Sequence, residues 1–521
     1  MEEQQELPQG WEITKLDEVM LPVRGIAFPK EVKAHAPAEG HIACLRTTNV
    51  QRKVEWGDLW FIPRQYAKRE DQIIQPLDIL ISTANSYELV GKVAQVHAIP
   101  HESTLGAFIS LLRVKAPFDA KFFYHYLSAS STQEAIRGFA STTTNISNVS
   151  TGKLATLDVV VPPLPEQRRI VAKLEELFSK LDAGVAAVRR TQALLKRYRQ
   201  SVLHAAVTGE LTRAWREAHP APAETGAALL KRIRAERRAQ WEAAQVAKRG
   251  GQLTLGDGWK SKYVEPEAVD AMGLPELPEG WIWGSVEQLS NTVQYGSSAK
   301  TREDEGGVPV YRMGNIIDGK LDNSNFKYLP AAHEEFPALL LDAGDLLFNR
   351  TNSPELVGKT AVYRGTPAVA SFASYLIRVK LNASISPDLV AYCLNSIYGK
   401  NWIKSVVTQQ VGQANVNGTK LQAFVIPLPP VGEQAEIVAE VERRLTVLDA
   451  LSRTLTDELK RAERLRQSIL HRAFTGRLVP QDATDEPAAA LLARLRETPA
   501  ALAKTKAGRG RKAAGQIGLS F

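Results

Sequence analysis

"RQSVLHAAVTGEL" occupies residues 199–211 of this chain, and "RQSILHRAFTGRL" occupies residues 466–478. The two segments are identical at nine of thirteen positions and lie 267 residues apart. Both mix basic and apolar residues, and both have a glycine two positions before the last leucine. A chain that carries such a segment twice is expected to present two similar surfaces, so the sequence around each copy should also match.

The similarity extends over about 200 residues in each copy. Residues 148–211 match residues 415–478 at the constant offset of 267, without a gap. Three motifs further upstream recur as well: "LPQGW" (7–11) and "LPEGW" (277–281), "ELVGK" (88–92 and 355–359), and "LLRVK" (111–115) and "LIRVK" (376–380). The sequence therefore predicts an internal duplication.

Each copy begins with a part in which short apolar runs are broken by Gly, Asn, Ser and Pro. Such runs predict strands, and one amphipathic run predicts a short helix. In the first copy the predicted strands are "LDILIST" (77–83), "LGAFISLLRVK" (105–115) and "LDVVVPPL" (157–164), and the predicted helix is "DAKFFYHYLSAS" (119–130). This mixture predicts an α+β globule in each copy.

The second part of each copy is expected to be one long helix. It begins after "PPLPEQ" or "PLPPVGEQ", where proline ends a strand and Glu166 or Glu433 lies near the positive helix N-terminus. Apolar residues then recur three or four positions apart, at Ile170, Leu174, Leu177, Leu181, Val185, Val188, Leu195, Tyr198 and Val202, and at Ile437, Val441, Leu445, Leu448, Leu455, Leu459, Leu465 and Ile469. Gly209 and Gly476 occupy the expected helix C-caps.

A helix of about 43 residues is about 65 Å long, which is too long for its single apolar stripe to be buried on one small globule. The two helices are therefore expected to pair with each other. An antiparallel pair puts one globule at each end of a pseudo-twofold arrangement, whereas a parallel pair crowds both globules together. We expect an antiparallel coiled coil.

The sequence thus predicts an α+β protein with a pseudo-twofold internal repeat and six parts. These are a first globule (1–160), a long helix (161–211), a basic helix and linker (212–276), a second globule (277–426), a second long helix (427–478), and a short helix with a basic tail (479–521).

Charge, cysteine content and the length of apolar runs bear on the partners and the compartment of the protein. The formal net charge of +8 and the pI near 9.2 are compatible with a polyanionic partner, and equally with a basic enzyme that binds no nucleic acid. Only two cysteines occur, which points to a reducing compartment. The polar N-terminus does not resemble a secretory signal, and no apolar run is long enough to span a membrane. We expect a cytoplasmic protein without a membrane partner.

Catalytic and metal-binding motifs were not found in the sequence. "GKT" (358–360) resembles the end of a P-loop, but Ser353 stands where the first glycine is required. Neither double proline has the acid or amide before it and the aromatic residue after it that an amino-methyltransferase uses to grip its base. His204 and His471 match across the repeat, but each is a lone histidine on a helix. We expect no catalytic residue and no metal site.

"PPLPEQRRIVAKLEELFSKLDA" (162–183), followed by a helix that ends in "RQSVLHAAVTGELT", resembles the central region of specificity subunits of type I restriction-modification systems. "LPEGW" at the start of a globule, "ELVGK" within it and "PLP" with "EQ" at its end belong to the same pattern. The resemblance covers nearly the whole chain. One departure is Val-Gly before Glu433, where the first copy reads "PLPEQ", and this is expected to alter the turn into the second helix.

The resemblance implies that each globule is a target-recognition domain that reads one half of a split, asymmetric sequence in double-stranded DNA. The helices would set the spacer and dock two methyltransferase subunits, and restriction subunits would join them. The chain itself would be non-catalytic and bind no cofactor. S-adenosylmethionine, ATP and Mg are expected on the partner subunits.

On this interpretation, residues that match in both globules do not explain how two different half-sequences are read. They are instead candidates for a scaffold or for contacts with DNA phosphates, and for the asparagines a turn-capping role is an alternative. The matched residues are Arg46, Asn49, Asn85, Lys92, Asn148 and Lys153 in the first copy, and Arg312, Asn315, Asn352, Lys359, Asn415 and Lys420 in the second.

Sequence reading is expected where the copies differ. The divergent stretches are 51–75 against 317–342, the loop 291–306, and 141–147 against 408–414. The last pair reads "STTTNIS" and "TQQVGQA", rich in hydroxyl and amide groups that can bond to base edges. The candidate readers are Thr143, Asn145, Arg350, Gln409, Gln410 and Gln413.

Two other functions remain open from the sequence. One is a stand-alone DNA-modifying enzyme whose motifs are cryptic. The other is a nonenzymatic coiled-coil scaffold of another defence complex.

Overall fold

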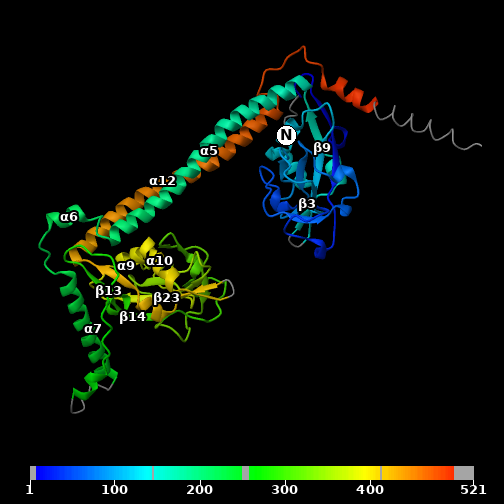
Figure 1. Ribbon diagram of the computed structural model, residues 1–521. Coiled ribbons are helices and arrows are strands. Elements are labelled where there is room, and N and C mark those ends of the chain that lie inside the picture. Colours follow the sequence, from blue (N-terminus) through cyan, green and yellow to red (C-terminus); the bar gives the residue numbers. More distant parts are fainter. Residues whose placement is uncertain (1–6, 144–145, 249–256, 411–412, 498–521) are drawn as a thin grey trace, which may run out of the picture. The chain divides into compact units, whose positions relative to one another are not determined.

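The computed structural model describes residues 7–143, 146–248, 257–410 and 413–497, and the chain forms two compact units (Figure 1). Unit 1 comprises residues 1–188 and 456–521, and unit 2 comprises residues 189–455. Two 44-residue helices, α5 (Leu164–Val207) and α12 (Val431–Phe474), each begin in one unit and end in the other. Each unit therefore contains one globule, the beginning of one long helix and the end of the other.

The globule of unit 1 is built from four small sheets and four short helices. The sheets are β2 (Met20–Arg24), β9 (Ile109–Val114), β5 (Ile79–Ser82) and β7 (Val93–Gln95); β4 (Trp60–Pro63), β3 (His41–Leu45) and β8 (Ser103–Leu105); β1 (Glu12–Lys15) and β12 (Asp158–Val161); and β10 (Ser141–Thr143), β11 (Ile146–Asn148) and β6 (Ala84–Asn85). The helices are α1 (Leu16–Val19), α2 (Ala120–Ser128), α3 (Ser130–Gly138) and α4 (Thr151–Ala155), with 3-10 turns at Lys30–Val32, Thr47–Asn49, Arg64–Tyr66 and Glu70–Gln72.

Unit 2 repeats these four sheets in the same strand order. They are β14 (Ser290–Tyr295), β23 (Leu376–Leu381), β19 (Leu346–Asn349) and β21 (Thr360–Val362); β18 (Lys327–Leu329), β15 (Val308–Tyr311) and β22 (Ser371–Phe372); β13 (Ile282–Ser285) and β26 (Val425–Leu428); and β24 (Thr408–Gln410), β25 (Gln413–Asn415) and β20 (Thr351–Asn352). Unit 2 adds the pair β16 (Ile316–Ile317) and β17 (Lys320–Leu321). Its short helices are α8 (Val286–Leu289), α9 (Pro387–Asn395), α10 (Ile397–Val406) and α11 (Gly418–Gln422), and a 3-10 turn spans Met313–Asn315.

The predicted duplication is confirmed, and the predicted elements are present, except that the strand predicted over 105–115 is divided between β8 and β9. Strands β5, β9 and β12 and helix α2 lie within the stretches that the sequence assigned to them. The predicted basic helix is α7 (Gly226–Lys248), preceded by α6 (Arg213–Ala218) and followed by a 3-10 turn at Asp257–Lys262. Residues 488–497, which repeat the beginning of α7, are helical as well.

One motif that matches between the copies in sequence has a different strand register in the two sheets. Strand β5 pairs Ile79 with Leu112, and β19 pairs the equivalent Leu346 with Val379. "LLRVK" and "LIRVK" are therefore two positions out of step in the sheets. Because strand side chains alternate with a period of two, Arg113 and Arg378 still lie on the same face, and they bind the equivalent buried carboxylates, Asp78 and Asp345.

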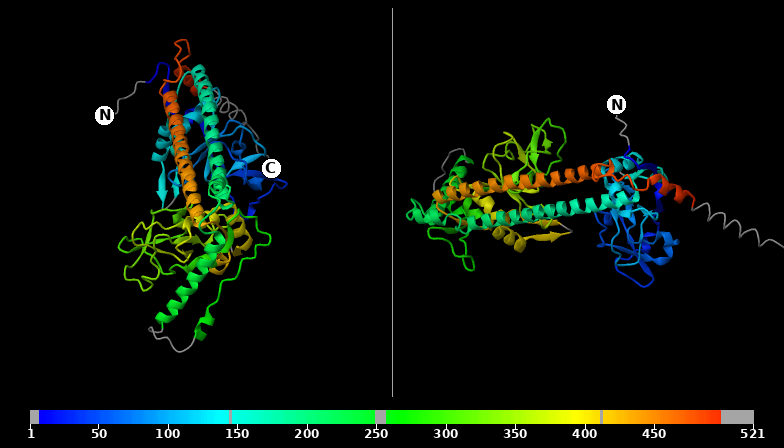
Figure 2. Two further views of the ribbon diagram at one scale, coloured as in Figure 1. Left: turned by 90° about the vertical axis from the view of Figure 1, so that its left-hand side faces the viewer. Right: turned by 90° about the horizontal axis from the view of Figure 1, so that it is seen from above.

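The long helices pair as an antiparallel coiled coil, and they lie side by side in Figures 1 and 2. In unit 1, Arg466 of α12 forms an ion pair with Asp182 of α5. In unit 2, the repeat-related Arg199 of α5 forms one with Asp449 of α12. Each ion pair joins the first half of one long helix to the second half of the other, so the helices run in opposite directions in each unit and the same contact recurs in both copies.

The apolar stripe of these helices needs a correction at two positions. The interface follows a heptad spacing, with half-buried residues at Val188, Leu195 and Arg199 in α5 and at Leu459 and Arg466 in α12. The sequence assigned Tyr198 and Leu465 to this stripe, but they are 49% and 50% exposed. The neighbouring Arg199 and Arg466 hold the interface positions instead, because their ion pairs satisfy both charges between the helices.

A hydrogen bond from a tryptophan indole to a buried glutamate fixes the start of each long helix to its globule. Trp11 Nε1 donates to Glu166 Oε2 at 2.9 Å, and Trp281 Nε1 donates to Glu433 Oε2 at 2.8 Å. Both carboxylates are 1% exposed. The tryptophans belong to "LPQGW" and "LPEGW" at the start of each globule, and the glutamates belong to the "EQ" pair at its end. The segment that opens each globule therefore binds the segment that closes it. Since α5 and α12 begin at equivalent residues, the expected change of the turn before Glu433 does not occur.

The glutamine that follows each glutamate connects the long helix to a second helix of the same globule. Gln167 accepts from the backbone N–H of Asp119, which caps α2, and donates to the Pro162 carbonyl. Gln434 accepts from the N–H of Ser386, which caps α9, and donates to the Pro429 carbonyl.

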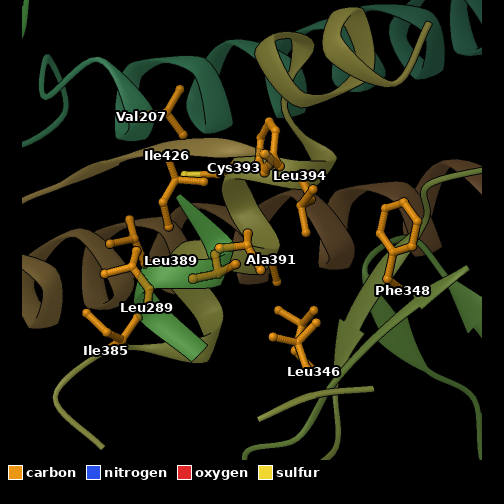
Figure 3. Close-up of a cluster of buried hydrophobic side chains, with 14 of the residues drawn as sticks. Val207, Leu289, Leu346, Phe348, Ile385, Leu389, Ala391, Cys393, Leu394 and Ile426 are labelled. Atoms are coloured by element: carbon orange, nitrogen blue, oxygen red, sulfur yellow. The ribbon is translucent and has the colours of Figure 1, made fainter. Parts of the chain in front are cut away.

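The "LPQGW" and "LPEGW" motifs also contact the end of the other long helix. Gly209 and Gly476 have φ of +70° and +69°, which confirms the predicted C-caps. A Cβ at Gly209 would collide with the ring of Pro278, and one at Gly476 with the ring of Pro8. In unit 2, Val207 at the end of α5 is buried in the core with Ile426 of β26 (Figure 3).

The helical segments after the long helices also dock on these motifs. Gly226 N donates to the Gly280 carbonyl at 2.7 Å, and Ala488 N donates to the Gly10 carbonyl at 2.9 Å. Each segment carries an equivalent internal ion pair, which joins Arg232 to Glu224 in unit 2 and Arg494 to Glu486 in unit 1.

The two glutamates differ in their further partners. Glu433 Oε1 accepts from Thr212 at 2.7 Å and from Arg216 at 2.5 Å. Glu166 Oε1 is buried and has no hydrogen-bond partner within the described residues. Burial raises the pKa of the Glu166 carboxyl, although the bond from Trp11 works against this shift.

Glu433→Gln is expected to lower the free energy of unfolding by about 2–3 kcal/mol, because it leaves the Arg216 guanidinium without its carboxylate. Glu166→Gln is expected to cost about 1 kcal/mol or less, because the amide oxygen still accepts from Trp11 and no second partner is lost. Urea unfolding followed by tryptophan fluorescence measures both values, and equal losses would contradict the account.

The pH profile provides a control. A carboxyl whose pKa is raised in the folded state stabilises the fold most at pH below its ordinary value of 4.5, and this stability is lost as the pH rises through the raised pKa. Glu166→Gln should remove this step from the pH dependence of unfolding, and Glu433→Gln should retain it.

Candidate nucleic-acid interface

Candidate reading residues that the structure describes lie on one three-stranded sheet in each unit, or beside it in the case of Arg350, and we call this sheet the hairpin sheet. In unit 1 it consists of β10, β11 and β6, and in unit 2 of β24, β25 and β20. Strand β11 places Asn148 opposite Ala84 and Ser147 opposite Asn85. Strands β25 and β20 repeat this register at the equivalent residues. The hairpins β10–β11 and β24–β25 coincide with the divergent segments 141–147 and 408–414, so two different sequences adopt the same strand pairing.

The side chains of the hairpin sheets differ in exposure. Thr143, Asn148 and Gln413 are exposed, whereas Asn415 is half-buried and donates to Thr351 Oγ1 at 2.7 Å. Asn145 lies outside the described residues. Gln409 and Gln410 lie on β24, and their side chains are outside what the structure describes. The exposed polar side chains among these candidates are thus on the hairpin strands β10, β11 and β25.

Asn85 and Asn352 cap the turn that follows β6 or β20. Asn85 Oδ1 accepts from the N–H of Ser86 at 2.9 Å, and Asn352 Oδ1 accepts from that of Ser353 at 2.8 Å. Asn85 also donates to Ser82 Oγ. These bonds match the turn-capping alternative.

Asn49 and Asn315 are buried parts of the scaffold, 2% and 3% exposed. Each accepts from the N–H of the arginine three positions earlier, at 2.8 and 2.9 Å. Their amides donate to two backbone carbonyls, those of Glu55 and Gly57 in unit 1, and those of Asp322 and Ser324 in unit 2. These two side chains hold the loop that follows in a fixed conformation and have no amide hydrogen left for another partner.

The arginines beside them face the same loops. The Arg46 guanidinium donates to the carbonyl and the carboxylate of Asp58 and lies 4.4 Å from the ring of Trp60. Arg312 donates to the Asn325 carbonyl at 2.7 Å. Asp58 and Asn325 both have positive φ, 51° and 54°, so each arginine supports a strained turn at the same place. A structural role of these arginines is evident, and contact with phosphate stays a prediction.

The matched lysines have different environments. Lys153 Nζ donates to the carbonyl of Phe139 at the end of α3, and Lys420 Nζ donates to that of Val406 at the end of α10. A cation at a helix C-terminus stabilises the free carbonyls there. Lys92 Nζ donates to Gln51 Oε1, and burial lowers the pKa of this ammonium group. Lys359 is half-buried.

Arg350 lies at the edge of the hairpin sheet of unit 2, next to β20. Its guanidinium is 4.8 Å from the ring of Tyr295 and 3.4 Å from the Ser374 carbonyl. The equivalent residue of unit 1 is Thr83, whose N–H bonds to the backbone in the same way. An arginine in one globule and a threonine in the other is a difference of the kind that can distinguish two DNA sequences.

The other divergent stretches adopt different structures in the two units. Residues 51–75 contain β4 and two 3-10 turns, whereas residues 317–342 contain β17 and β18. The stretch 291–306, which the sequence predicted as a loop, begins with strand β14 up to Tyr295, and further along it Arg302 pairs with Tyr328 through two backbone hydrogen bonds of 2.9 Å.

A group of metal ligands and a membrane-spanning helix are both absent from the described part of the chain. Within residues 7–143, 146–248, 257–410 and 413–497, no three His, Cys, Asp or Glu side chains form a group that could hold a metal ion. His204 and His471 are exposed on their helices. None of the helices in those ranges is long and apolar enough to cross a membrane.

Comparison with known proteins gives one consistent result. The model of the type I restriction modification DNA specificity domain matches residues 8–186 and 284–461, one block for each copy. The specificity subunit of the type I restriction enzyme EcoKI from Escherichia coli K12 is 28% identical over 515 residues, which cover 96% of this chain and 98% of the relative. The StySPI specificity subunit of Salmonella potsdam is 26% identical over 485 residues, 92% of each chain.

A solved structure from work on the assembly and conformational transition of the type I R-M system has the same fold. It aligns with a TM-score of 0.59 at 19% identity and covers 91% of this chain and 100% of its own. Since the domain model matches most of the chain, in two blocks that correspond to the two copies, this protein belongs to the family of DNA specificity subunits of type I restriction-modification systems.

Proposed function

We propose that each globule reads one half of a split, asymmetric DNA sequence, and that the hairpin sheet is the reading surface. The observation that carries this proposal is the pair of hairpins: the same strand register presents "STTTNIS" in one unit and "TQQVGQA" in the other. A constant backbone with variable polar side chains is what two readers of different sequences require.

Two lysines are proposed to serve affinity rather than sequence reading. Lys92 and Lys359 follow the turns after β6 and β20 and are proposed to contact phosphates. Arg350, beside the hairpin sheet of unit 2, is proposed to read a guanine edge. Asn49 and Asn315 are proposed to act only through the loops that they hold.

The long helices are proposed to set the distance between the half-sites and to dock two methyltransferase subunits, with restriction subunits joining the complex. The names of the relatives, which are specificity subunits of restriction enzymes, support this assignment. The chain is proposed to be non-catalytic and to bind no cofactor itself. S-adenosylmethionine, ATP and Mg would then be bound by the partner subunits.

Gln413→Ala is expected to relax sequence preference at one position of one half-site, and Thr143→Ala at one position of the other. Loss of a side-chain bond to a base costs about 1–3 kcal/mol of discrimination. Methylome sequencing of cells that express the chain with its methyltransferase subunit measures the change. Relaxation of the same half-site by both variants would contradict separate reading.

Insertion of seven residues after Thr191 in α5 and seven after Glu458 in α12 is expected to lengthen the spacer. A heptad in both helices keeps the interface residues in phase and adds about 10 Å, close to three base pairs. The half-sequences should stay unchanged in the methylome. Unchanged spacing, or altered half-sequences, would refute the proposal that the long helices set the distance between the half-sites.

A further inference from the structure

Phe108 and Tyr375 expose an aromatic ring at the same place in the two globules. Phe108 is 62% exposed and Tyr375 is 48% exposed, and Phe108 is the most exposed aromatic side chain in the described part of the chain. The strand register makes them equivalent, because β9 and β23 begin directly after them and pair with β5 and β19 in step. The sequence predicted one continuous strand over 105–115, but residues 106–108 form a turn between β8 and β9.

The backbone of this turn is held tightly in both units. In unit 1, Gly106 N donates to the Leu45 carbonyl and Ile109 N donates to the Gly106 carbonyl, both at 3.0 Å. In unit 2, Ala373 N donates to the Tyr311 carbonyl at 2.9 Å and Leu376 N donates to the Ala373 carbonyl at 2.8 Å. The rings are therefore carried by a fixed turn rather than by a free loop.

The turn is connected directly to the hairpin sheet. The Phe108 carbonyl accepts from the N–H groups of Thr83 and Ala84, and Ala84 belongs to β6. The Tyr375 carbonyl accepts from Arg350 N at 3.0 Å, just before β20. The residue that carries each exposed ring is thus bonded through its backbone to the edge of the sheet that is proposed to read DNA.

A residue type that both copies share cannot distinguish two half-sequences, but it can contact what all duplex DNA has in common. An exposed aromatic ring offers a flat apolar surface to the deoxyribose rings along the backbone of a duplex, and this contact does not depend on sequence. Arginine and lysine contacts release counterions from DNA, whereas an aromatic contact does not, so the two kinds of contact respond differently to salt.

We infer that Phe108 and Tyr375 are DNA-contacting residues that pack against the deoxyribose rings beside each half-site and add affinity without reading sequence. This inference rests on the proposed function of the globules. A protein partner on these rings, such as the methyltransferase subunit, is the competing occupant, and the experiment separates the two.

The test uses the full chain in complex with its methyltransferase subunit. Two duplexes of equal length serve as probes: one carries the target mapped by methylome sequencing of the parent complex, and the other has both half-sites replaced. Fluorescence anisotropy at a series of salt concentrations gives the affinity and its salt dependence. Phe108→Ala and Tyr375→Ala are each expected to weaken binding to both duplexes about tenfold, with the slope of log affinity against log salt unchanged.

Matched variants serve as controls. Phe108→Tyr and Tyr375→Phe should bind both duplexes like the parent, because the ring is kept. Ile13→Ala removes a side chain that is 52% exposed on another sheet of unit 1 and should have no effect.

Three results would overturn the inference: parental affinity of the alanine variants, a loss confined to the target duplex, or loss of the methyltransferase subunit from the complex. Failure of the proposed function is a separate result. In that case the parent complex itself would bind the two duplexes with equal affinity.

Discussion

The rest of the structure depends on a single buried interaction, the hydrogen bond from the indole of Trp11 or Trp281 to the glutamate that begins the long helix. A carboxylate in an apolar core is stable there only with donors around it, and the indole N–H supplies one at the positive end of the helix. The bond therefore fixes the point at which each long helix leaves its globule. The adjacent Gln167 and Gln434 fix the helix against a second element of the same globule.

The same motif accepts the end of the other long helix, through Pro8 against Gly476 and Pro278 against Gly209. Each globule is thus tied to the start of one helix and to the end of the other. In an antiparallel pair this arrangement repeats itself in the second copy, as the ion pairs of Arg466 and Arg199 also do. The duplicated chain can therefore carry two hairpin sheets on equivalent scaffolds while the hairpins themselves change. The junctions that hold the fold are thus the same in both copies, and the hairpins that are proposed to read DNA differ.

Much of this could be predicted from the sequence because the signals are local or repeated. The proline before Glu166, the apolar spacing of α5 and the glycine at 209 define a helix with a start and an end. The constant offset between the copies then predicts the second helix and the pairing. Tyr198 was placed wrongly because a spacing of three or four admits both it and Arg199, and only the ion pair with Asp449 decides between them.

The site was harder to predict, since it depends on contacts between distant residues. Asn49 and Asn85 look alike in the sequence, but one is buried beneath a loop and the other caps a turn beside the hairpin sheet. The exposure of Phe108 gave no signal either, because an aromatic residue within an apolar run resembles part of a strand. The divergent segments 141–147 and 408–414 do lie on equivalent hairpins, and their role in reading DNA stays a prediction.

The most direct test of the central claim is photocrosslinking from each hairpin. A photoreactive amino acid replaces Thr143 in one variant and Gln413 in another, and the assembled methyltransferase complex is irradiated on a duplex with the mapped target. The account predicts that position 143 crosslinks to bases of one half-site and position 413 to bases of the other. Crosslinks from both positions to the same half-site, or to the spacer alone, would contradict it.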